Sequence, residues 1–188
     1  MMTNDARRKI EGGIFLALFC LTIPAANWMI GHVGTFCIPN GPCVVPVAPG
    51  LMAPSGVLMI GAALVLRDLV QRRLGAAFGV AAIVVGAALS AGLAPPSLVL
   101  ASATAFLLSE AADFAVYTPL ARRRLVLAVL ASSMVGLVVD SFIFLWLAFG
   151  SLDFLGGQIV GKAWMVLLSI PLVAYLRRRD LRLGLNPV

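Results

Sequence analysis

The sequence predicts an all-α integral membrane protein, a bundle of six transmembrane helices, and three observations support this prediction. The first two are that 61% of the 188 residues are hydrophobic and only 12% are charged. A soluble domain carries about 25% charged residues, and one of this size cannot bury so much apolar surface. Because a helix crosses the hydrocarbon core with about 20 residues, the chain has room for about six spans. We therefore expect a single transmembrane domain, residues 1–188.

The third observation is the placement of the positive charges. All but one of the 14 Lys and Arg residues fall into four clusters at the ends of apolar runs: residues 7–9, Arg67 with residues 72–73, residues 122–124, and residues 177–179 with Arg182. Such clusters mark the cytoplasmic loops of membrane proteins, so the net charge of +6 does not indicate nucleic-acid binding. The clusters alternate with connections that hold no Lys or Arg. We therefore expect a multi-pass protein with both termini in the cytoplasm.

The apolar runs give the six predicted spans in order: residues 12–31, 51–68, 75–93, 97–119, 125–149 and 158–176. Residues 7–9 followed by Pro24-Ala-Ala26 also resemble a signal peptide with its cleavage site. Cleavage would remove the first span and break the alternation of charge, so we expect this span to be retained. The third span carries small residues at helical spacing, which predicts a close-packed helix face.

The longest connection, residues 32–50, is expected outside and contains four prolines, Cys37 and Cys43. On an oxidising side these two cysteines can form a disulfide, or they can remain free thiols in an ordered loop, and the sequence leaves both interpretations open. Cys20 is interpreted as packing within the first span. Because His32 is the single histidine, we expect no metal site and no cofactor.

Polar residues inside the spans are the candidate site. Glu110 and Asp113 lie three residues apart in the fourth span and so share one helix face, which Phe106 and Tyr117 extend in both directions. The other spans contribute further polar side chains: Asn27 in the first, Arg67 and Asp68 at the end of the second, Asp140 in the fifth, and Gln158 and Lys162 in the sixth.

A charge at the bilayer centre costs at least ~2.5 kcal/mol, so these residues should face the bundle interior. A purely structural interpretation pairs Lys162 with Asp140 in an internal salt bridge. However, the three carboxylates Glu110, Asp113 and Asp140 outnumber the one lysine. One or two of them therefore need a proton, water or a ligand. A carboxylate beside aromatic rings suits a flat molecule rich in donors, and both a guanine-like base and an organic cation meet this description.

Four segments resemble the VUT, or YhhQ-like, family of transporters. These are "ALVLRDLVQRRLG" from Ala63, "ASATAFLLSEAADFAVYTPLARRR" from Ala101, "SSMVGLVVDSFIFLWLAF" from Ser132 and "GQIVGKAWMVLLSIP" from Gly157. They match the order and spacing of polar residues in about four of the six spans. The chain departs from the family pattern in its long outer connection and in Met52-Ala-Pro-Ser-Gly56.

The resemblance implies a six-helix transporter in a bacterial cytoplasmic membrane, including that of a phage-infected bacterium, that imports 7-deazaguanine precursors of queuosine. It also implies the fold of the S-components of energy-coupling-factor transporters. Carried over by position, its site residues are Arg67, Asp68, Glu110, Asp113, Asp140, Lys162 and Gln158. With Asn27, Phe106 and Tyr117 they form the predicted substrate-binding set, in which we expect Glu110 to be the main ligand carboxylate.

The expected partners are a purine-like substrate and membrane lipids. The chain has no phosphate-binding loop, and Ala17 is followed four residues later by Leu21, so the sequence shows no stripe of small residues for an ATPase partner. The sequence leaves open whether the protein forms a homodimer. Alternatives are a transporter of another small polar molecule, such as a vitamin or an organic cation, an intramembrane enzyme, or an assembly subunit without a ligand.

Overall fold

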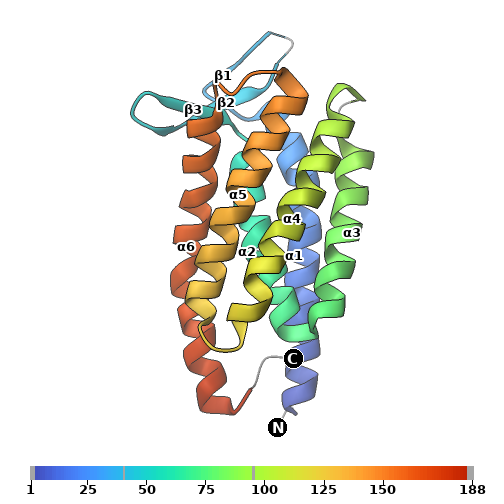
Figure 1. Ribbon diagram of the computed structural model, residues 1–188, viewed down its shortest axis with the longest axis vertical. Coiled ribbons are helices and arrows are strands. Elements are labelled where there is room, and N and C mark those ends of the chain that lie inside the picture. Colours follow the sequence, from blue (N-terminus) through green and yellow to red (C-terminus); the bar gives the residue numbers. More distant parts are fainter. Residues whose placement is uncertain (1–2, 40, 95, 186–188) are drawn as a thin grey trace.

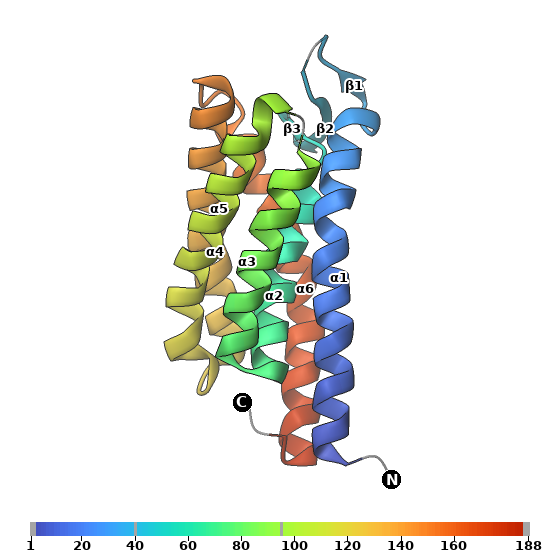
Figure 2. The ribbon, with the colours of Figure 1, turned by 90° about the vertical axis from the view of Figure 1, so that its right-hand side faces the viewer.

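Six α-helices lie side by side along the long axis of the computed structural model, in the described residues 3–39, 41–94 and 96–185 (Figures 1 and 2). They are α1 (Asn4–His32), α2 (Val57–Leu74), α3 (Ala76–Leu93), α4 (Val99–Ala121), α5 (Leu125–Phe149) and α6 (Leu155–Leu183). A short 3-10 turn, Pro96–Leu98, precedes α4. The prediction of six helices is confirmed.

Five of these helices are long and apolar enough to cross a membrane, as counted over the described part of the chain. The exception is α2, because its 18 residues include four charged ones, Arg67, Asp68, Arg72 and Arg73. All four are nevertheless buried, since α2 contacts each of the other five helices. The central helix of the bundle therefore carries four buried charged residues.

The predicted start of the second span was wrong. Residues 51–54 form a strand instead of a helix, and α2 begins only at Val57 and continues to Leu74. Pro54 explains the difference, because it lacks the backbone N–H that a helix interior needs. The shift moves Arg67 from the predicted end of the span to the middle of the helix. Two other helices are longer than predicted: α1 begins at Asn4 and α6 ends at Leu183.

A small antiparallel sheet covers one end of the bundle, and the sequence analysis did not predict it. Within the described residues its strands are β1 (Phe36–Cys37), β2 (Cys43–Ala48) and β3 (Leu51–Pro54), in that order. The run Val44-Val45 favours a strand, and Gly50, with a φ of 73°, allows the turn between β2 and β3. Cys37 lies opposite Cys43 in the β1–β2 register, and the two form a disulfide.

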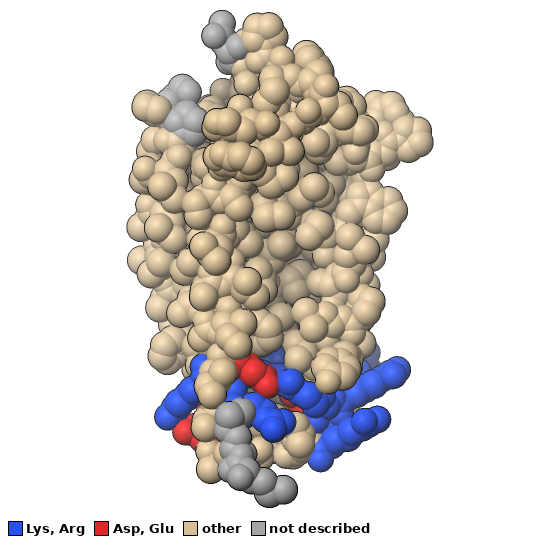
Figure 3. Space-filling view, turned by 180° about the vertical axis from the view of Figure 1, so that it is seen from behind, with Lys and Arg blue, Asp and Glu red and all other residues tan. Residues whose placement is uncertain are grey.

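The charged residues gather at the other end of the bundle, where α1 begins and α6 ends (Figures 1 and 3). On the face that Figure 3 shows, the rest of the surface carries no Lys, Arg, Asp or Glu. We call this the basic end, defined by residues 7–9, 122–124 and 177–179, and the opposite one the sheet end, defined by β1–β3. Apart from Arg67, which lies inside the bundle, the basic clusters thus belong to one end of the molecule, as the sequence predicts.

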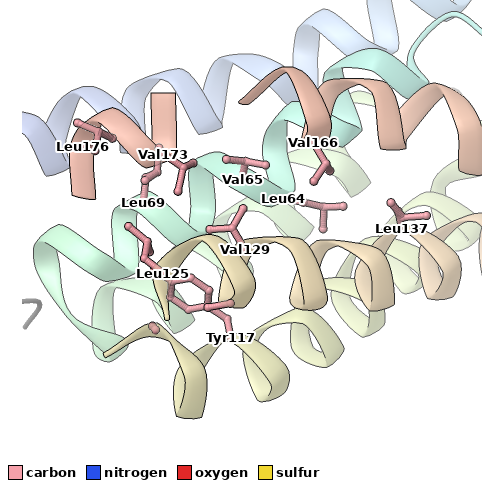
Figure 4. Close-up of a cluster of buried hydrophobic side chains, with 12 residues drawn as sticks. Leu64, Val65, Leu69, Tyr117, Leu125, Val129, Leu137, Val166, Val173 and Leu176 are labelled. Carbon is pink, nitrogen blue, oxygen red and sulfur yellow. The ribbon is translucent and has the colours of Figure 1, made fainter. Parts of the chain in front are cut away.

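An apolar core fills the bundle from its middle to the basic end. Side chains from α2, α4, α5 and α6 meet there (Figure 4), among them Leu69, Tyr117, Leu125 and Leu137, each at most 2% exposed. A second apolar cluster joins α1, α2, α3 and α4 around Phe19. The bundle is therefore closely packed toward the basic end.

Candidate functional site

A cavity lies between two groups of helices in the half of the bundle nearer the sheet end. Its volume is about 60 Å³, well below the several hundred Å³ usual for small-molecule sites, so its walls must move apart to admit a ligand. Helices α1, α2 and α6 form one wall and α3, α4 and α5 form the other. A wider hollow shares Asn27, Ile30, Pro54 and Phe144 with it and extends to Pro42 beside the sheet. The cavity is therefore continuous with a hollow that leads toward the sheet end.

An ion pair between Lys162 and Asp140 joins the two walls of the cavity. Lys162 Nζ donates to Asp140 Oδ2 at 2.5 Å, to Gln158 Oε1 at 2.6 Å and to Ser141 Oγ at 2.8 Å. These three contacts use all three donors of the ammonium group, which is 1% exposed. The predicted pairing of Lys162 with Asp140 is confirmed. Gln158 takes part because it lies one helical turn before Lys162 on α6.

Several polar atoms remain for a ligand in the cavity. Asp140 keeps Oδ1, which is 3.5 Å from Ser109 Oγ. Gln158 uses its carbonyl oxygen on Lys162, so its amide nitrogen is left to donate. Asn27 Nδ2 donates to the Ile23 carbonyl at 3.0 Å, which leaves Asn27 Oδ1 to accept. The cavity thus offers acceptors and donors within a few residues of one another.

Aromatic and hydroxyl side chains complete the walls. Phe106 of α4 and Phe144 of α5 both line the cavity, and so do Ser90 of α3 and Ser102 of α4. Neither serine was predicted from the sequence. Spacing could have identified Ser102, which lies one helical turn before Phe106 on the same face. Two rings beside a set of hydrogen-bonding atoms suit a planar polar ligand.

A second charged group lies deeper in the bundle, and we call it the Arg67 cluster: Arg67, Asp68, Glu110 and Asp113. Arg67 Nε donates to Glu110 Oε2 at 2.8 Å, Arg67 Nη2 donates to Asp113 Oδ1, and Arg67 Nη1 lies 2.9 Å from Asp68 Oδ1. These side chains are at most 2% exposed. The Arg67 guanidinium also lies 5.9 Å from the centre of the Tyr117 ring. One guanidinium therefore holds three carboxyl groups.

The structure divides the ten predicted site residues into two sets. Five line the cavity: Asn27, Phe106, Asp140, Gln158 and Lys162. The other five do not line the cavity. They form the Arg67 cluster or contact it: Arg67, Asp68, Glu110, Asp113 and Tyr117.

The carboxylate that lines the cavity is Asp140, whereas we expected Glu110 to have this role. Glu110 is paired with Arg67, which the sequence analysis had placed at the end of its span. Two adjacent residues of α4 contact the two charged groups. Ser109 lies beside Asp140, and the next residue, Glu110, belongs to the Arg67 cluster.

A third group of charged residues joins three helices through ion pairs at the basic end. Asp180 of α6 accepts hydrogen bonds from Arg72 and Arg73 of α2, at 2.8 to 3.0 Å. Glu11 of α1 accepts from Arg73 at 2.8 Å and from Arg179 of α6 at 2.6 Å. The sequence analysis interpreted these arginines only as a topology signal. Their partner Asp180 is 1% exposed and joins α2 to α6.

Comparison with known proteins gives one finding. Residues 92–177, slightly less than half of the chain, match the family model described as "Putative vitamin uptake transporter". No curated protein and no solved structure matches the chain. The matched segment holds Phe106, Asp140, Gln158 and Lys162 of the cavity together with Glu110 and Asp113. Across α4, α5 and most of α6 the chain is therefore similar to a family of vitamin-uptake-type membrane transporters.

Proposed function

We propose that this chain imports a 7-deazaguanine precursor of queuosine and binds it in the cavity beside Asp140. The observation that carries the proposal is the position of the cavity. It lies between two groups of helices, and a transporter must move such groups relative to each other to change which side its site faces. The family match supports the general function of small-molecule uptake.

The atoms in the cavity suit a guanine-like edge. Such an edge donates from a ring N–H and an exocyclic amine, which Asp140 Oδ1 and Asn27 Oδ1 can accept. Its carbonyl oxygen can accept from the Gln158 amide. Phe106 and Phe144 are placed to pack on the faces of the ring. A ligand with these contacts uses the cavity atoms that the ion pair leaves free.

In this proposal the basic end faces the cytoplasm and the sheet end faces outward. The gathering of the basic clusters at one end supports this orientation. The substrate then enters the cavity from the sheet end and leaves at the basic end, where the apolar core now closes the bundle.

Uptake by whole cells tests the proposal. The full chain is expressed in host cells that cannot make or import deazaguanines, and labelled 7-cyano-7-deazaguanine is added. We expect uptake above that of cells without the chain, and a loss of this uptake in Asp140→Asn. Asp153→Asn, an exposed acid in the connection before α6, serves as the matched control. Absent uptake with correctly inserted protein would contradict the proposed substrate.

A vitamin is the second candidate, because the matched family model carries that description. Thermal unfolding of the purified protein against a panel of water-soluble vitamins and deazaguanines separates the two. A ligand that binds only the folded protein raises the unfolding temperature. Stabilisation by one vitamin, with none by any deazaguanine, would favour this second candidate.

A further inference from the structure

The Arg67 cluster contains more carboxyl groups than basic groups, and it is buried inside the bundle. Its three carboxyl groups face one guanidinium, and all four side chains are at most 2% exposed. If every group were ionised, the cluster would carry a net charge of −2, because 1 − 3 = −2. Among the described residues no nearby cation is left to balance it: Lys162 is paired with Asp140, and Arg72 and Arg73 are paired at the basic end. Uncompensated buried charge is strongly unfavourable.

The geometry of Asp68 and Asp113 shows where a proton fits. Both carboxyl groups contact the same guanidinium: Arg67 Nη1 lies 2.9 Å from Asp68 Oδ1, and Arg67 Nη2 donates to Asp113 Oδ1. Asp113 Oδ2 is buried and has no hydrogen bond among the described residues, and Asp68 Oδ1 has only its ion pair with Arg67. Since a hydrogen bond between two carboxyl groups needs a proton on one of them, a single proton supplies the missing donor. Neighbouring carboxyl groups commonly share one proton in this way.

The surroundings of Asp113 offer no other source of positive charge. Around it are, from α2, Arg67 and Asp68; from its own helix, Glu110 and Tyr117; and from α5, the hydroxyl group of Ser132, with the Asp140–Lys162 pair beyond Glu110. Ser132 donates to Asp68 Oδ2 at 3.1 Å. The Tyr117 hydroxyl is buried without a hydrogen-bond partner among the described residues.

The cluster also lies between two hollows. Toward the sheet end is the cavity, which Asp140 and Ser109 connect to Glu110. Toward the basic end is a hollow of similar volume, lined by Gln71, Arg72, Tyr117, Thr118 and others. The ion pairs of Arg67 join α2 in one wall to α4 in the other, so these two helices must part before a substrate can pass between the hollows.

We propose that the Asp68–Asp113 pair is a proton-binding site that couples uptake to the inward movement of one proton for each substrate. This inference rests on the proposed transport function. In the state described here one proton is held between the two carboxyl groups. When α2 and α4 part, water reaches the pair, both carboxylates ionise, and the proton leaves on the basic side. When the bundle closes again, a proton from the cavity side restores the shared hydrogen bond.

Two measurements on liposomes that contain the purified full chain test this proposal. Exchange of labelled for unlabelled 7-cyano-7-deazaguanine without any gradient reports transport alone. Accumulation under a pH gradient, acidic on the side of entry, reports the coupling. A gradient of one pH unit drives up to about tenfold accumulation for one proton per substrate. We expect the ratio of accumulation with and without the gradient to fall close to one in Asp68→Asn and in Asp113→Asn, and to be unchanged in Asp153→Asn.

Infrared spectroscopy tests the proton itself and needs no substrate. The unmodified protein at neutral pH should show the carbonyl band of a protonated carboxyl group, and this band should disappear in Asp113→Asn. A missing band in the unmodified protein would overturn the proposal whether or not the variants fold. Exchange that runs while the gradient has no effect would also overturn it and would leave the proposed function intact. Absent exchange, with the band present, would overturn the proposed substrate instead.

Discussion

Gly61 of α2 packs directly against the backbone of Lys162 on α6. A Cβ atom placed on Gly61 would lie 2.7 Å from the Lys162 carbonyl oxygen and 2.9 Å from its Cα, closer than atoms in proteins approach. Only a glycine at this position lets α6 come near enough to α2 for the Lys162 side chain to reach Asp140 across the cavity. The ion pair of the site thus depends on a missing side chain on a third helix.

Gly61→Ala is therefore expected to displace α6 and to destabilise the protein by about 1–3 kcal/mol, the usual cost of overpacking. Gly13→Ala is the matched control, because a Cβ at Gly13 meets nothing within 4 Å and Gly13 is also inside a helix. Thermal unfolding in detergent measures both variants. Equal unfolding temperatures for the two would contradict the close approach of α2 and α6.

A double-mutant cycle tests the pair Asp140–Lys162. Lys162→Met leaves the Asp140 carboxylate without its cation and should lower stability by about 1–3 kcal/mol, the cost of an unsatisfied buried polar group. Adding Asp140→Asn should recover part of this loss, because the remaining amide carries no charge. The free energies of unfolding of the four proteins give the coupling. If the two single effects simply add, the ion pair contributes nothing.

Ligand affinity should depend on Asp140 more than on Glu110. Asp140→Asn removes the charged acceptor in the cavity and should weaken deazaguanine binding by about 1.5–3 kcal/mol, or about one to two orders of magnitude. Glu110→Gln should weaken it less, since Glu110 contacts Arg67 instead of the cavity. Calorimetry on folded variants measures both affinities. A larger loss of deazaguanine affinity in Glu110→Gln than in Asp140→Asn would indicate that Glu110, as first expected, is the ligand carboxylate.

The orientation of the molecule can be tested through its disulfide. Cys37 is exposed at the sheet end, whereas Cys20 lies part-buried within α1. If the sheet end faces outward, intact cells treated with a reductant and then with a thiol reagent, neither of which crosses membranes, should become labelled. The Cys37→Ser/Cys43→Ser double variant should not. Labelling that appears only after the cells are opened would reverse the proposed orientation.

Composition and charge placement predicted the helical bundle well, because both report on the lipid around it. The sheet was harder to predict. Pro54 and the Val44-Val45 run lie in or beside the apolar residues 51–68, whose composition is also typical of a membrane span. That single error moved Arg67 to the end of its helix. With Arg67 removed from the interior, Glu110 and Asp113 had no cation and were interpreted as ligand contacts.

The pairing of Lys162 with Asp140 was predictable because the two residues were the simplest complementary charges among the spans. The division of the site residues between the cavity and the Arg67 cluster was not predictable, because it depends on how α2 and α4 are rotated about their axes. The burial of Asp180 was not predicted either, because an acid among four arginines is typical of an exposed loop. Its burial against Arg72 and Arg73 follows only from the packing of α6 on α2.

The buried charges of α2 have a consequence for the order in which the protein is made. This helix leaves the ribosome second, yet its charged side chains pair with residues made much later: Glu110 and Asp113 of α4, and Asp180 of α6. Until then, α2 alone is too polar to stay in lipid. We therefore expect α2 to pack against α1 until the later helices arrive. A chain stopped before α6 would keep Arg72 and Arg73 without Asp180, so we expect the second helix of an unfinished molecule to be poorly held in the membrane.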